Sequence, residues 1–80
     1  MRYFFHVFDN GDRIADEVGV LLADDATAQA EAARFLTDLA REMIAKAGVR
    51  SCDVEVLDEA GRKVATLGFS LRQDPGVGRR

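Results

Sequence analysis

The chain has 80 residues, enough for one small domain with a modest hydrophobic core. Its net charge of −3 argues against a general binder of nucleic acid, and its single cysteine excludes an intramolecular disulfide. No apolar run approaches the roughly 20 residues that a membrane-spanning helix needs. We therefore expect a cytoplasmic protein.

The first element expected is a strand over residues 2–8, because aromatic and β-branched side chains follow one another there without a glycine or proline. Side chains alternate across a strand, so its two faces differ. One face would carry Tyr3, Phe5 and Val7. The other would carry Phe4, His6 and Phe8.

A turn follows at residues 9–12, whose sequence Asp-Asn-Gly-Asp suits a tight hairpin. The return segment is irregular. Residues 13–15 begin to pair with the first strand, residues 16–19 form a bulge or a second turn, and residues 20–22 resume the strand.

A helix is expected over residues 25–47, with Asp24 as its N-cap and Gly48 as the residue that ends it. Alanines keep the helix propensity high along this segment. Apolar residues recur at spacings of three and four, which predicts one buried stripe. The stripe consists of Ala28, Ala32, Phe35, Leu36, Leu39, Met43 and Ala47.

A second hairpin closes the domain. Residues 52–57 alternate as a strand, residues 58–61 form a turn, and residues 62–69 return as the last strand. The remaining residues lack periodicity and include the only proline, so the domain spans residues 1–70 and residues 71–80 form a flexible tail.

These elements predict an α+β fold, ββαββ, with one helix packed on a four-stranded antiparallel sheet of order 2-1-3-4. The helix would cover the face that carries Tyr3, Phe5, Val7, Cys52, Val54, Val56, Leu67 and Phe69. The first strand would then lie inside the sheet with Phe4 and Phe8 uncovered. A partner on that face is one explanation, and an interface of Phe4, His6 and Phe8 follows from it. The alternative is that arginine and glutamate side chains partly shield two exposed aromatic rings.

The sequence offers no set of residues for catalysis or for metal binding. His6 is the only histidine and Cys52 the only thiol, and the predicted facing places them on opposite sides of the sheet. The acidic residues between 9 and 25 do not match a calcium-binding loop, and no glycine-rich loop joins a strand to a helix. We expect no enzyme activity, no cofactor, no metal and no nucleic-acid partner.

Three segments in this order carry a family resemblance: "RYFFHVFDNGD", "DEVGVLLAD" before the helix, and "VEVLDEAGRKVATLGF". Together they resemble a family of short bacterial proteins classed as a domain of unknown function, over residues 2–69. Asp16, Glu17 and Gly19 occupy the family's D-E-x-G segment, in which Val18 stands where an acidic residue is frequent. The resemblance implies the fold and carries no activity with it.

The function expected is therefore that of a non-catalytic protein-interaction or assembly module. Its partner would be a second copy of the chain, in a homodimer, or another protein. The alternative is a small-ligand-binding or regulatory domain that uses the face of Phe4, His6 and Phe8.

Overall fold

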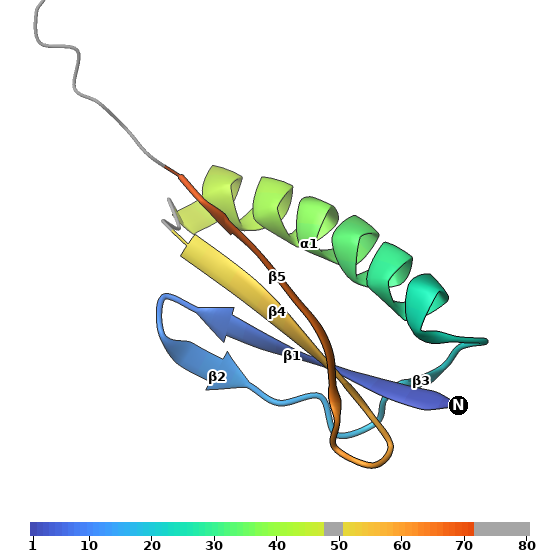
Figure 1. Ribbon diagram of the computed structural model, residues 1–80. Coiled ribbons are helices and arrows are strands. Elements are labelled where there is room, and N and C mark those ends of the chain that lie inside the picture. Colours follow the sequence, from blue (N-terminus) through green and yellow to red (C-terminus); the bar gives the residue numbers. More distant parts are fainter. Residues whose placement is uncertain (48–50, 72–80) are drawn as a thin grey trace, which may run out of the picture.

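A computed structural model, which describes residues 1–47 and 51–71, has one helix lying on a five-stranded antiparallel sheet (Figure 1). The predicted α+β class is confirmed. The strands lie in the order β2-β1-β4-β5, and β3 pairs with the same edge of β1 as β2 does. The elements in chain order are β1 (Arg2–Asp9), β2 (Asp12–Ile14), β3 (Val20–Leu21), α1 (Asp25–Ala47), β4 (Ser51–Asp58) and β5 (Lys63–Ser70).

The sheet differs from the predicted order at one place, the segment that returns after β1. This segment forms two short strands rather than one, because residues 15–19 leave the ladder between them. Strand β2 pairs with residues 7–9 of β1, and β3 pairs with residues 2–3. Within residues 1–47 and 51–71, no strand therefore pairs with the middle of β1 on this side.

Both hairpins have the turns that their sequences predict. Asn10 and Gly11 join β1 to β2 with φ values of 51° and 94°, as a type I′ turn requires at both central residues. In the second turn the Asp58 carboxylate accepts backbone hydrogen bonds from Ala60 and Arg62, and Gly61 has a φ of 84°.

Helix α1 begins where the sequence predicts, at an N-cap formed by Asp24. The Asp24 carboxylate accepts a hydrogen bond of 2.8 Å from the Thr27 backbone N–H. The Thr27 hydroxyl donates a second hydrogen bond to the same carboxylate, and this bond, followed by the backbone one, lowers the pKa of Asp24. The predicted helix end at Gly48 and most of the predicted tail, residues 72–80, lie outside the described residues. No helix in the described part of the chain is long and apolar enough to cross a membrane.

The core lies between α1 and the sheet, on the predicted face. Its buried side chains include Cys52, Val54 and Val56, and the helix contributes mainly small residues. Among the described residues, the buried apolar side chains are Tyr3, Val7, Ala28, Ala32, Leu36, Cys52, Val54 and Val56. Of the predicted stripe, Ala28, Ala32 and Leu36 are buried and Leu39 and Met43 are partly buried. Phe35 remains 39% exposed, because α1 packs against β4 and β5 and Phe35 points beyond them toward β1.

Candidate binding groove

The unpaired stretch of β1 is filled by a side chain, Asp16. Its Oδ2 accepts a hydrogen bond of 3.1 Å from the Phe5 backbone N–H, which has no strand partner on this side. Its Oδ1 accepts hydrogen bonds from the backbone N–H groups of Val18 and Gly19. Burial pushes the pKa of Asp16 upward, but these three backbone donors outweigh it and hold that pKa below its ordinary value.

The segment that contains Asp16 is fixed against β1 by further contacts. The Asp16 backbone N–H donates a hydrogen bond of 3.0 Å to Nδ1 of His6, and Arg2 donates one to the Val18 carbonyl. Gly19, with a φ of 74°, approaches β1 so closely that a Cβ there would lie 2.8 Å from the Tyr3 carbonyl oxygen. Only glycine fits this position without strain.

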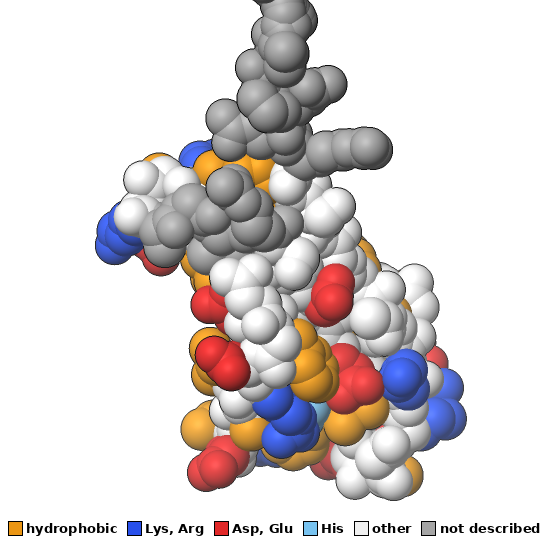
Figure 2. Space-filling model, turned by 90° about the vertical axis from the view of Figure 1, so that its left-hand side faces the viewer, with side chains coloured by type: hydrophobic (Ala, Val, Ile, Leu, Met, Phe, Trp, Pro, Cys, Tyr) orange, Lys and Arg blue, Asp and Glu red, His pale blue; other side chains and the backbone are white. Residues whose placement is uncertain are grey.

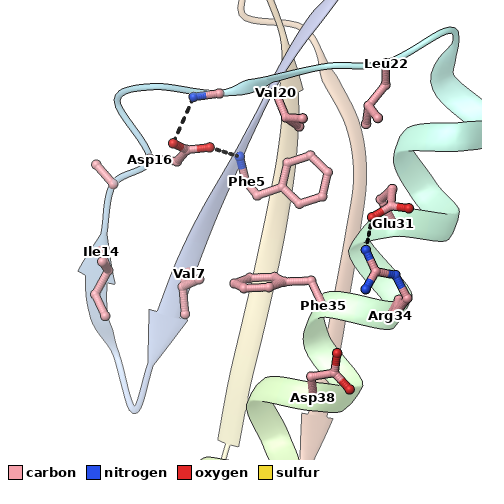
Figure 3. A pocket seen from close by; sticks show the side chains of 12 residues that line it. Phe5, Val7, Ile14, Asp16, Val20, Leu22, Glu31, Arg34, Phe35 and Asp38 are labelled. Carbon is pink, nitrogen blue, oxygen red and sulfur yellow. Dashed lines mark hydrogen bonds and ion pairs between the residues drawn. The ribbon is translucent and has the colours of Figure 1, made fainter.

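This loop forms one wall of a groove on the helix side of the sheet. Because α1 lies over β4 and β5, the part of the same face that belongs to β1, β2 and β3 is not covered by the helix. The groove between them has a volume of about 470 Å³ (Figure 3). Its apolar lining consists of Phe5, Val7, Ile14, Ala15, Val20, Leu22 and Phe35.

The helix contributes one aromatic ring and a charged rim to the groove. Phe35 meets Phe5 edge to face, with ring centroids 6.4 Å apart, a favourable arrangement for two aromatic rings. Glu31, Arg34 and Asp38 line the same side of α1, and Arg34 pairs with Glu31. Phe35 is 39% exposed, Val20 43% and Ile14 57%, so large apolar surfaces face solvent here.

The predicted interface of Phe4, His6 and Phe8 is less open than the sequence suggests. His6 is only 7% exposed, and Phe4 and Phe8 are half-buried. The reason is the loop after β2: Asp16 bonds to His6, and Gly19 lies against the Phe4 ring. On the side of the molecule shown in Figure 2, hydrophobic side chains lie among acidic and basic ones and form no broad patch.

Cys52 lies where the sequence predicts, in the core and on the opposite face from His6. Its side chain is fully buried. Burial raises the pKa of the Cys52 thiol, and the nearby charges of Asp9 and Asp53 act in the same direction. The thiol therefore stays protonated and poorly nucleophilic. Within residues 1–47 and 51–71, no group of three or more His, Cys, Asp or Glu side chains could hold a metal ion.

A polar network at the start of α1 is the other concentration of charged groups. The Tyr3 hydroxyl donates a hydrogen bond of 2.8 Å to Asp25, and Arg62 bridges Asp25 and Asp58 at 2.8 and 3.0 Å. Burial of Tyr3 and its bond to Asp25 raise the pKa of the phenol to about 12. The network ties the helix to the β4–β5 hairpin, and each of its side chains already has a partner.

The sequence analysis did not predict the groove, although two features of the sequence indicate it. Residues 13–22 contain Ile14, Val20 and Leu22, which line the groove, as well as Val18 and Leu21, and these are more large apolar residues than an irregular return segment needs. Phe35 lies at the margin of the helical stripe, next to charged positions. Where these apolar side chains come together depends on the position of α1 over the sheet. The periodicity of the sequence does not determine that position.

Comparison with known proteins identifies the family of the chain. A family model described as "Domain of unknown function (DUF6894)" matches residues 2–70, all six elements of the fold. No curated protein and no solved structure matches the chain.

Proposed function

The chain belongs to the family of domains of unknown function DUF6894, and we propose from the features of its surface that it is a non-catalytic protein-interaction module. The observation that carries the proposal is the apolar groove between α1 and the β1 edge. We place the module in the cytoplasm, where a lone reduced cysteine is ordinary.

The groove suits an apolar peptide segment of a partner protein. Exposed apolar side chains rimmed by polar ones are typical of such sites. In this groove Ile14, Val20 and Phe35 offer side chains from three different elements, with Glu31, Arg34 and Asp38 along the helix rim. An inserted apolar side chain would contact both the Phe5–Phe35 pair and the β2 edge.

The chemistry of the groove supports a non-catalytic role. The half-buried carboxylate of Asp16 accepts hydrogen bonds from three backbone donors and therefore is not free to act as a base. Nucleic acid is an equally poor fit, because acidic side chains outnumber basic ones among the groove residues.

A second candidate is a small apolar ligand in the same groove. The volume of about 470 Å³ falls within the range of roughly 300–1,000 Å³ found for small-molecule pockets. The face of Phe4, His6 and Phe8 supports this role less well, because His6 is buried and its Nδ1 is already bonded.

The test is selection of binding peptides from a random 12-residue display library, followed by amide chemical-shift mapping of the selected peptides on the labelled protein. The variants are Ile14→Glu, in the groove, and Val18→Glu as its control. Val18 is 76% exposed and does not line the groove, so the control adds the same charge to another exposed aliphatic site.

We expect shifts at residues 5, 14 and 35, and binding that Ile14→Glu weakens at least about tenfold while Val18→Glu leaves it unchanged. Equal effects of the two variants, or shifts confined to the opposite face of the sheet, would refute the groove. If a library of small apolar fragments shifts these residues and no peptide does, the ligand-binding candidate replaces the peptide.

A further inference from the structure

A second surface, distinct from the groove, lies along the outer edge of β5. This eight-residue strand ends the sheet, and no described strand pairs with its outer side. Natural proteins protect such edges with charged residues, prolines or short strands. From Val64 to Ser70 the strand has none of these, and Lys63 at its start is bonded to Glu55. The edge is therefore open to another strand.

The hydrogen bonds of the sheet identify which groups this edge presents. The Phe5 N–H points away from β4, because it donates to Asp16. Along a strand, the N–H and C=O groups of successive residues point alternately to its two sides, and the two residues of a hydrogen-bonded pair point these groups toward each other. In the register Val54↔Leu67 and Glu55↔Thr66, Leu67 therefore bonds to β4. The backbone groups of Thr66 and Gly68 point outward, without a partner in the sheet.

The edge is complementary to itself in an antiparallel register centred on Leu67. Two copies related by a two-fold axis would pair each Thr66 with Gly68 of the other copy, so that the Thr66 hydroxyl faces the Asp53 carboxylate that lies over that Gly68. On the helix side of the sheet, each Phe69 would face Ala65 of the other copy, a large residue against a small one. Strand β5 itself carries no charged side chain between Val64 and Ser70.

The flank of α1 above this edge is also uncharged. Glu31, Arg34 and Asp38 point to the groove, whereas the positions about half a turn away around the helix point toward β5. These positions are occupied by Gln29, Ala33, Ala40 and Ile44. Small residues here allow two helices to approach closely.

The spacing of the layers brings these two flanks together. Helix α1 contacts both β4 and β5, so we place it above the seam between them. Neighbouring strands lie about 4.8 Å apart, and a two-fold axis between two paired β5 strands lies halfway between them. The seam between β4 and β5 is therefore about 5 Å from this axis. The two helices would then be about 10 Å apart, close to the 8–10 Å of packed helices.

We propose that the partner at this surface is a second copy of the chain, in a homodimer whose two β5 strands pair antiparallel and whose α1 flanks pack together. The proposal is independent of what occupies the groove. It differs from the sequence-based interface of Phe4, His6 and Phe8 in placing the contact at the opposite edge of the sheet from β2.

The test is light scattering on wild type and four variants over a concentration series. Thr66→Pro removes an outward N–H and no bond to β4, and Thr66→Val is its control because the N–H remains. Ala40→Glu places a charge on the uncharged flank of α1. Ala30→Glu is the matching control, since Ala30 is exposed and lies on the solvent side of the helix.

We expect dimers for wild type and both controls, and at least about tenfold weaker association for Thr66→Pro and Ala40→Glu, each with its helix signal in circular dichroism intact. Amide exchange at residues 66 and 68 should slow as the protein concentration rises. A monomeric wild type at high micromolar concentration would overturn the proposal, as would a dimer that survives both Thr66→Pro and Ala40→Glu. If Thr66→Pro unfolds, Ala40→Glu and the exchange rates decide.

Discussion

Replacing Asp16 by alanine should destabilise the domain far more than replacing its neighbour Glu17. Asp16 accepts hydrogen bonds from three backbone N–H groups, and that of Phe5 is half-buried inside the sheet edge. Glu17 is exposed and has no hydrogen bond in the described part of the chain. The two substitutions therefore remove the same kind of charge from adjacent positions with different consequences.

The magnitude follows from what each donor loses. Hydrogen bonds to charged groups contribute about 1.5–3 kcal/mol each. Val18 is exposed and its N–H can turn to water, so the loss arises mainly at Phe5 and Gly19. We expect Asp16→Ala to lower the free energy of unfolding by about 2–4 kcal/mol. A domain of 80 residues has only about 4–12 kcal/mol in total.

Urea unfolding followed by the helix signal measures this difference, with Glu17→Ala as the control. We expect Glu17→Ala to stay within about 0.5 kcal/mol of wild type. Equal unfolding free energies for the two variants would refute the role of Asp16 as the substitute for a missing strand.

Acid should remove the same contribution. The folded pKa of Asp16 is depressed, so its stabilisation is present above the ordinary value of 3.8 and is lost as the pH falls through the folded pKa. The difference between wild type and Asp16→Ala should therefore shrink below pH 3.8. Because both proteins contain Asp24, Asp25 and Asp58, whose pKa values are also lowered, the contributions of these groups cancel in the comparison. A difference that stays constant down to the lowest pH would contradict the assignment.

Three further predictions concern single residues. Tyr3 is the only tyrosine and the chain has no tryptophan, so an ultraviolet titration should show a phenol midpoint near 12; between pH 10 and 12 the unfolded state alone loses this proton, and stability should fall. A midpoint of 10 in the folded protein would contradict this. Gly19→Ala should cost more stability in urea than Gly11→Ala, because both have positive φ but only at Gly19 would a Cβ meet the backbone of β1. Cys52 should react with a thiol reagent slowly in the native protein and fully in denaturant, and equal rates would show that the thiol is accessible.

The parts of the fold that periodicity and turn chemistry govern could be predicted from the sequence. The alternation of β1 and β4 identified the core face, the three–four spacing and Asp24 identified α1, and Asn10-Gly11 identified the hairpin. Each of these is a local property, since the residues that decide it lie within one element.

The candidate groove could not be predicted, because it depends on distances between elements. The sequence does not say that α1 sits over β4 and β5 rather than over β1, and this offset is what leaves Phe35 exposed. Nor does it say that one carboxylate takes the place of a strand. A reader of the sequence who does not know that Asp16 bonds to the β1 backbone interprets residues 16–19 as a turn. The packing of this loop against His6 is then not predicted either.

The two proposed surfaces lie on opposite sides of α1, and this arrangement makes them compatible. The groove uses the helix positions near Phe35 and the β1 edge, whereas the homodimer would use β5 and the flank near Ala40. A pairing of two β5 strands would extend the sheet and leave each β2 at an outer end. Both grooves would then face away from the two-fold axis, so one dimer could hold two peptide segments at once. Ile14→Glu should accordingly weaken peptide binding without changing the dimer mass, and Ala40→Glu should do the reverse. A variant pair that fails to separate in this way would mean that the two surfaces are one.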